Sequence, residues 1–119
     1  MGVFNVTIRI ANPVLSSRSS EIELLVDTGA TLTAMLHSLL RSFGIEPGMA
    51  RTFLVADGRR FQRETGTVLA TMNGVTMAIP VMFAEEGDAS VLGATALEIL
   101  GFVIDPVEHK LVPRDLLAL

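Results

Sequence analysis

The sequence predicts a small, mostly β domain built as a closed barrel with one or two short helices. Many short apolar runs, each bounded by turn residues, follow one another along the chain. Two of the turns carry the hairpin dipeptides Asp57-Gly58 and Asn73-Gly74, and only two short segments space their apolar residues as a helix does. A length of 119 residues suits a single domain over residues 1–119.

The first half of the chain is expected to form two strands and a helix. Apolar and polar residues alternate from Phe4 to Ile10, as in a strand with one buried face. After a polar connection, a more apolar strand over 21–26 runs directly into Asp27. Apolar residues three and four positions apart in 35–43 predict a short helix that ends at Gly44.

The second half is expected to contain two hairpins, a second helix and two short final strands. Asp-Gly and Asn-Gly pairs tolerate the positive φ angles of tight hairpin turns. An exposed loop is expected at 85–88, and a helix over 94–100 that stops at Gly101. The expected strands are 52–56, 60–64, 68–72, 75–83, 91–92, 102–104 and 110–112.

The composition argues against several classes of function. Half of the residues are hydrophobic and 18% are charged, which argues against disorder and leaves apolar material for a subunit interface. The net charge of −4 disfavours nucleic acid as a partner, because only Arg59, Arg60 and Arg63 approach a basic cluster. No cysteine is present for thiolate or metal chemistry, and His37 and His109 are far apart in sequence, so no metal site is expected.

No part of the chain is typical of a membrane or targeting segment. The longest apolar stretch, Val91 to Ile104, is too short to cross a bilayer and contains Glu98. The N-terminus lacks the basic and apolar regions of a signal peptide, and Val6 replaces the Ser or Thr of a myristoylation motif. We therefore expect a cytoplasmic protein without a membrane anchor.

The most informative motif is Asp27-Thr28-Gly29-Ala30, which follows the apolar second strand. An Asp-Thr-Gly tripeptide occurs by chance in about 2% of chains of this length, so its context adds weight. Far downstream, Val91-Leu92-Gly93 leads into the second predicted helix. This combination resembles the retropepsin-like aspartic proteases. Residues 92–101, Leu-Gly-Ala-Thr-Ala-Leu-Glu-Ile-Leu-Gly, and 56–59, Ala-Asp-Gly-Arg, are similar to the small stand-alone bacterial and archaeal members.

The resemblance implies a role for each residue of the active turn, which we define as residues 27–30. Asp27 is expected to be the catalytic acid or base. Thr28 is expected to point its hydroxyl across a two-fold axis to the partner's active turn, and Gly29 to bring its backbone N–H close to the carboxylates. Ala30 lacks a hydroxyl that would favour the charged form of the carboxylates. We therefore expect activity to extend nearer to neutral pH than in family members with Ser or Thr at this position.

The resemblance also implies a flap over the substrate and an element that packs beside the active turn. The flap tip is expected at Ala56, Asp57, Gly58 and Arg59. The packing element is expected at Val91, Leu92 and Gly93. Substrate would bind extended against the flap and the active turn. For each tip residue, a role in an ordinary β-turn is about equally plausible, because Asp-Gly is common in hairpins for backbone reasons.

The chemistry of the active turn predicts a homodimer. Hydrolysis of a peptide by an activated water needs one carboxylate to take a proton and one carboxylic acid to polarise the carbonyl. The chain has one Asp-Thr-Gly, whereas two-lobed aspartic proteases carry a second copy within a longer chain. The second carboxylate must then come from a second subunit across a two-fold axis. The predicted function is an aspartic endopeptidase that acts on peptides or proteins without a cofactor.

The chain departs from the retroviral pattern in several places. The flap lacks a glycine-rich tip, and Ala94 stands where an Arg or Asn is common. Residues 113–119 have no clear pattern of the terminal strand that retroviral dimers interleave. A dimer interface built in another way is therefore an alternative. Three other acidic residues are expected outside the site: Asp88 in a solvated loop, Glu98 on an exposed helix face and Asp105 in a turn.

Three alternatives stay open on the sequence. A retropepsin-like fold can serve dimerisation or peptide binding without hydrolysis. A plain β-barrel binding module would leave Asp27 exposed in a monomer. A Ser/His/Asp hydrolase is the weakest alternative, because no nucleophile-elbow motif lies near either histidine.

Overall fold

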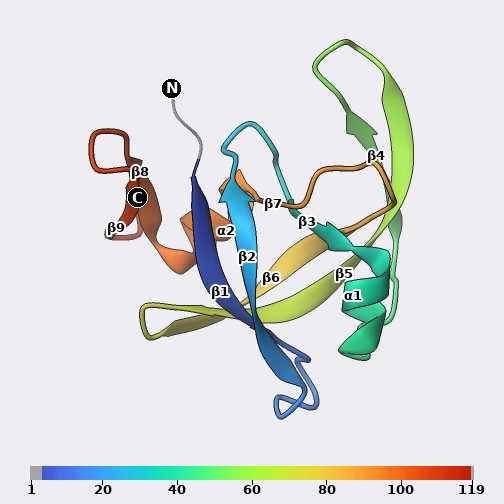
Figure 1. The fold of residues 1–119 in the computed structure, drawn as a ribbon, viewed down its shortest axis with the longest axis horizontal. Coiled ribbons are helices and arrows are strands. Elements are labelled where there is room, and N and C mark those ends of the chain that lie inside the picture. Colours follow the sequence, from blue (N-terminus) through green and yellow to red (C-terminus); the bar gives the residue numbers. More distant parts are fainter. Residues whose placement is uncertain (1–3, 119) are drawn as a thin grey trace.

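The structure, a computed structural model, describes residues 4–118 and is mostly β, as the sequence predicts (Figure 1). Its strands are β1 (Asn5–Ala11), β2 (Ser19–Val26), β3 (Thr33–Leu36), β4 (Ala50–Leu54), β5 (Arg60–Met72), β6 (Val75–Ala84), β7 (Val91–Leu92), β8 (Phe102–Asp105) and β9 (Lys110–Pro113). Its helices are α1 (His37–Ser42) and α2 (Ala94–Leu100). Among residues 4–118, no helix is long and apolar enough to cross a membrane.

The strands of the main sheet form a ring around the core. Their order is β1-β2-β7-β3-β6-β5-β4, and a further pairing of β1 with β5 closes the ring. This arrangement is compatible with the closed barrel expected from the sequence. The ring encloses side chains such as Ile8, Ile10, Val68 and Leu92, which are almost completely buried. The alternation in β1 therefore points its isoleucines inward while Arg9 stays exposed.

The helix predicted over 35–43 is wrong in its first part. Residues 33–36 form strand β3, which pairs in parallel with β6, and α1 begins only at His37. Thr33, Ala34 and Met35 are all buried. A strand that is buried on both faces has no alternation of apolar and polar residues, so its pattern resembles the start of a buried helix.

The strands predicted at 60–64 and 68–72 are one continuous strand, β5. Gly66 lies where the prediction placed a break. A Cβ on Gly66 would stand 2.9 Å from the ring of Phe83, so glycine serves close packing here and does not interrupt the strand. The Asn73-Gly74 turn between β5 and β6 is confirmed, and both of its residues have positive φ angles.

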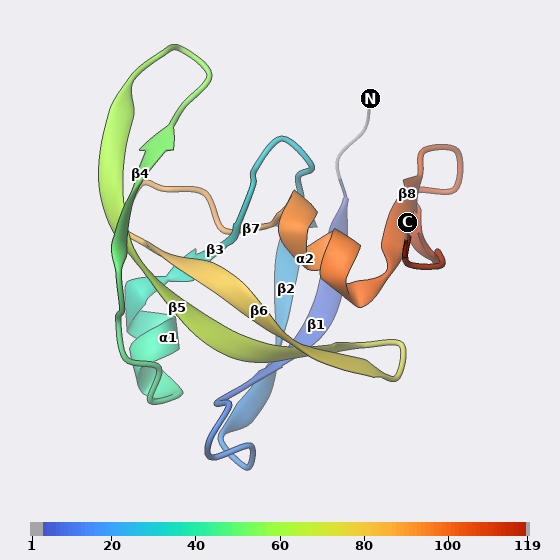
Figure 2. The same ribbon diagram turned by 180° about the vertical axis from the view of Figure 1, so that it is seen from behind.

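The C-terminal part follows the predicted order. α2 ends at Gly101, and β8 and β9 pair with each other in a separate two-stranded sheet (Figure 2). Within the 113–119 segment, Pro113 is the last residue of β9, residues 114–118 form no strand, as expected, and Leu119 lies outside the described residues. Asp105 accepts hydrogen bonds from two following backbone amides, which confirms its place in a turn, and Glu98 is exposed on α2.

A long hairpin made by β4 and the first part of β5 projects from the ring (Figures 1 and 2). We call this hairpin, residues 50–64, the flap. Its register pairs Phe53 with Phe61 and Arg51 with Arg63. Because side chains alternate between the two faces of a strand, these four residues share one face of the flap.

Candidate active site

The active turn begins where β2 leaves the sheet. The backbone N–H of Asp27 donates to the carbonyl of Leu92 at 3.0 Å, and the N–H of Ala30 donates to the carbonyl of Asp27 at 3.2 Å. The Asp27 carboxylate accepts the N–H of Gly29 through Oδ1 at 2.9 Å. Its side chain is exposed. The turn therefore holds one carboxylate in a fixed orientation at the surface of a single chain.

Gly29 fits this arrangement for a steric reason. A Cβ on Gly29 would stand 3.1 Å from Oδ1 of Asp27, which is tighter than most Cβ contacts. A side chain here would press on the carboxylate while its neighbouring amide donates to it. The backbone N–H of Gly29 thus lies close to the Asp27 carboxylate of its own chain.

Strand β7 and the start of α2 brace the active turn from behind. β7 pairs in parallel with the end of β2, joining Val26 to Leu92. The N–H of Ala94 donates to the carbonyl of Ala30 at 2.8 Å. A Cβ on Gly93 would stand 2.6 Å from the backbone of Leu32, so only glycine allows this approach.

Thr33 is a supporting residue that the sequence analysis missed. Its side chain is fully buried, and its hydroxyl oxygen accepts the N–H of Gly93 at 3.1 Å. Thr33 and Gly93 are far apart in the chain, so no local pattern links them. The buried amide of Gly93 thereby gains a partner that an apolar residue at position 33 would not supply.

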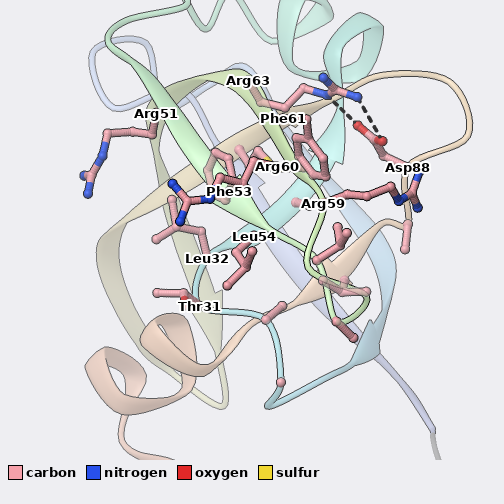
Figure 3. Close-up of a pocket in the computed structure, with 18 of the residues that line it drawn as sticks. Thr31, Leu32, Arg51, Phe53, Leu54, Arg59, Arg60, Phe61, Arg63 and Asp88 are labelled. Atoms are coloured by element: carbon pink, nitrogen blue, oxygen red, sulfur yellow. Dashed lines mark hydrogen bonds and ion pairs between the residues drawn. The ribbon is translucent and has the colours of Figure 1, made fainter.

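A long cleft lies between the active turn and the flap (Figure 3). Its volume is about 1510 Å³, larger than the roughly 300–1,000 Å³ typical of small-molecule pockets. Among the predicted site residues, those that line it are Asp27, Gly29, Ala30, Ala56, Arg59 and Val91. Leu92 and Gly93 are buried behind the turn, and Asp57 and Gly58 form the turn at the flap tip.

The flap tip is a tight turn closed by its own residues. The N–H of Val55 donates to the carbonyl of Arg59 at 2.9 Å, and Gly58 has a φ of 91°. The Asp57 carboxylate accepts the Arg59 backbone N–H and pairs with its guanidinium at 2.7 Å. Every residue from 56 to 59 is exposed.

Two contacts hold the flap against the body. Phe53 and Phe61 stack at 6.0 Å and pack against a buried cluster formed by Ala34, Met82, Ala84 and Val91. The guanidinium of Arg63 lies 4.5 Å above the ring of Phe61. The flap therefore presents an apolar inner surface beside the active turn.

Asp88 is the second contact. It lies in the predicted loop, where Glu86 and Gly87 are exposed, but its own side chain is largely buried because it pairs with the flap. Two guanidinium nitrogens of Arg63 donate to its carboxylate at 2.8 and 3.2 Å, and its side chain is 17% exposed. The Arg63 hydrogen bond lowers the pKa of Asp88 against the opposing effect of burial, and the Glu85 backbone N–H lowers it further. This ion pair joins the flap to the loop between β6 and β7 (Figure 3).

Comparison with known proteins identifies the family. The sequence profile of the family described as "gag-polyprotein putative aspartyl protease" matches residues 17–99. The chain belongs to this family. Its structure is similar to that of a retropepsin-like aspartic protease from Rickettsia conorii, with a TM-score of 0.57 and 22% identity, over 87% of this chain and 86% of that one. At this identity the likeness establishes the fold. No curated protein sequence matches the chain.

In this aspartyl protease-family chain, Thr28 is exposed and borders a second groove on the other side of the active turn. The groove has a volume of about 840 Å³ and is lined largely by α2, β8 and the C-terminal segment. Leu116 and Leu117 line it and are 65% and 85% exposed. An apolar surface therefore lies next to the residue that was expected to meet a partner.

Proposed function

We propose that the protein is an aspartic endopeptidase that works as a homodimer, with one Asp27 carboxylate from each subunit. One observation carries the proposal. In a chain of the aspartyl protease family, Asp27 sits on the floor of a long cleft, and its carboxylate is oriented by the Gly29 N–H at 2.9 Å. No other acidic residue of the cleft has this position: Asp88 is bound to Arg63 and Glu86 lies in an exposed loop.

The reaction needs one proton shared between the two carboxyl groups. The ionised Asp27 takes a proton from a water molecule, whose oxygen attacks the peptide carbonyl carbon. The protonated Asp27 of the other subunit gives its proton to the carbonyl oxygen. The tetrahedral intermediate then collapses, the C–N bond breaks, and the amine nitrogen leaves with a proton supplied by the pair. The two roles belong to the pair and not to either copy.

Two features favour a second copy as the source of the second carboxylate. The chain carries a single Asp-Thr-Gly, so each chain supplies one carboxylate of this motif. The exposed leucines 116 and 117 flank Thr28 in the groove described above. A two-fold contact through Thr28 would cover this apolar surface.

The substrate class follows from the shape of the cleft. Strand β4 is at the end of the strand order, so its outer backbone groups are free to pair with an extended peptide. Phe53 and Phe61 offer an apolar surface for a substrate side chain near the active turn. We therefore expect cleavage of extended peptide segments.

The test compares wild-type protein with Asp27→Asn and with Glu21→Gln, which removes an exposed carboxylate from β2 outside the cleft. A diverse peptide mixture is incubated with each protein across pH 4 to 8 at several concentrations, and products are identified by mass spectrometry. We expect cleavage by wild type and Glu21→Gln, loss in Asp27→Asn, and a rate that rises more steeply than linearly with dilute protein.

Equal behaviour of wild type and Asp27→Asn would contradict the proposal. So would the absence of any cleavage at concentrations where light scattering gives the mass of a dimer. A dimer that does not cleave would favour a peptide-binding or dimerisation role for the same fold.

A further inference from the structure

The cleft gathers positive charge in a protein whose net charge is −4. The chain has 9 lysines and arginines in all. The arginines that line the cleft are Arg51, Arg59, Arg60 and Arg63. A large share of the cations of an acidic protein therefore surrounds the region where a substrate would lie.

Two of these arginines are neutralised by the protein itself. Arg59 pairs with Asp57 at 2.7 Å and Arg63 pairs with Asp88 at 2.8 Å. Arg51 has no ion-pair partner among residues 4–118, and neither has Arg60. These two guanidinium groups keep a full charge for a ligand.

Arg51 is the better placed of the two. It shares the inner face of the flap with Phe53 and lies directly opposite Arg63 in the register. Figure 3 shows that Arg63 turns toward Asp88, whereas Arg51 points away from that pair. Arg51 is exposed and lies two residues before Phe53, on the same face of strand β4.

The other charges of the cleft do not cancel Arg51. Apart from Asp27, the acidic side chains that line the cleft are Glu86 and Asp88. Both belong to the loop between β6 and β7, which the Arg63 pair holds on the far side of the flap base from Arg51 (Figure 3). Arg60 also lines the cleft, but it opposes Leu54 in the register and therefore leaves the hairpin on the other face from Phe53.

We propose that the cleft selects peptides that carry an acidic side chain a few residues from the cleaved bond, and that Arg51 is the residue that binds this carboxylate. The inference rests on the proposed function, since it names the substrate class of that site. An apolar side chain of the extended peptide occupies the Phe53 surface, and an acidic side chain two positions away, on the same face of the peptide, reaches Arg51. The planar guanidinium suits bidentate binding of a carboxylate.

The expected preference is modest because Arg51 is exposed. Exposed ion pairs contribute little in water, which corresponds to about a threefold preference for an acidic over an equivalent neutral peptide. Added salt should reduce this preference, because exposed charges are screened. Arg60→Gln should have a smaller effect than Arg51→Gln.

The test uses peptides with a common apolar centre and either Glu or Gln at each flanking position. The ratio of kcat/KM for the Glu and Gln peptides is measured with wild type, Arg51→Gln, Arg51→Glu and Arg9→Gln. Arg9 is an exposed strand residue outside the cleft, so its variant carries the same charge change without touching the site. In parallel, binding of the same peptides to Asp27→Asn is measured by fluorescence anisotropy, with and without Arg51→Gln.

We expect a preference for Glu over Gln at one flanking position, its loss in Arg51→Gln, a reversed preference for Gln over Glu in Arg51→Glu, and no change in Arg9→Gln. Equal ratios in wild type, or a ratio that survives Arg51→Gln, would overturn the proposal. The binding arm separates the two claims. Selective binding of acidic peptides without any cleavage would support the acidic preference and contradict the endopeptidase function. Asp27-dependent cleavage without selectivity would support the endopeptidase function and contradict the acidic preference.

Discussion

The active turn and the flap face each other across one cleft, but they are held in different ways. The active turn is bound by backbone hydrogen bonds to β7 and α2, and its support is buried: Leu92 and Thr33 have no exposed surface. The flap is held by side chains of its strands, and its tip from 56 to 59 is exposed. The active turn is thus fixed through its backbone and a buried support, whereas the flap is attached through a few side chains.

A matched pair of glycine substitutions tests this difference between the active turn and the flap. Gly93→Ala places a Cβ 2.6 Å from the Leu32 backbone, which cannot move aside, so we expect a loss of about 3 kcal/mol in the free energy of unfolding. At Gly58 nothing lies within 4 Å of a Cβ, and only the positive φ is unfavourable. Gly58→Ala should therefore cost about 1 kcal/mol.

Urea denaturation at one protein concentration measures both changes, because dimer formation couples stability to concentration. Equal losses at the two glycines would show that the active turn is no more tightly packed than the flap tip.

The second prediction removes the hidden support of the turn. Thr33→Val keeps the shape of the side chain but deletes the acceptor of the buried Gly93 N–H, so we expect a loss of about 2 kcal/mol. Cleavage activity should fall as well, because Gly93 precedes the helix that braces the Asp27 turn. Thr7→Val, the same change on an exposed strand position, should leave both the urea midpoint and the activity unchanged. A neutral Thr33→Val would show that the Thr33 hydroxyl does not support the active turn.

The third prediction concerns the base of the flap. Asp88→Asn breaks the ion pair with Arg63, and we expect a loss of about 1 kcal/mol, because the pair is partly buried and bidentate. The pKa of Asp88 is lowered in the folded protein, so its contribution is complete above the ordinary Asp pKa of about 4 and is lost as pH falls through the lowered value.

The stability difference between wild type and Asp88→Asn should therefore be constant from pH 5 to 8 and shrink below about pH 4. Urea titrations at several pH values measure it. Asp57→Asn, which breaks the exposed pair at the flap tip, is the control and should change stability by less than about 0.5 kcal/mol. A difference that grows toward acid pH would have the wrong sign for this ion pair.

The smallest effect is expected at the active turn itself. Ala30→Ser adds a hydroxyl beside the carboxylates that favours their charged form, so the upper pH limit of cleavage should move toward acid by about half a unit. The pH profile of kcat/KM for wild type and variant measures this shift. A wild-type profile confined to strongly acidic pH, or a variant profile shifted toward neutral pH, would contradict the role given to Ala30.

The sequence predicts the parts of the fold that depend on local pattern. The alternation before Ala11, the Asn73-Gly74 turn and the helix that stops at Gly101 are all present. Strand β3 was missed because it is buried on both faces and pairs with strands distant in the chain. Gly66 was misjudged because its close packing against Phe83 depends on tertiary structure.

The candidate site also contains residues that the sequence predicts and residues that only the fold brings together. The active turn and the strand beside it carry a motif, so residues 27–30 and 91–93 could be singled out from the sequence alone. The support from Thr33 and the Arg63–Asp88 pair join residues that are far apart in the chain and belong to no motif. Only the folded arrangement brings these groups together: Thr33 supports the motif at Gly93, and the Arg63–Asp88 pair holds the flap.

A site shared between two chains can be detected by mixing active and inactive subunits. Wild-type protein is mixed with increasing amounts of Asp27→Asn at concentrations where the protein is dimeric, and peptide cleavage is measured. Random pairing places wild-type chains in mixed dimers that hold a single competent carboxylate, so activity should fall to about one quarter at a threefold excess of the variant. Activity that stays constant as Asp27→Asn is added would contradict a site built from one Asp27 of each subunit.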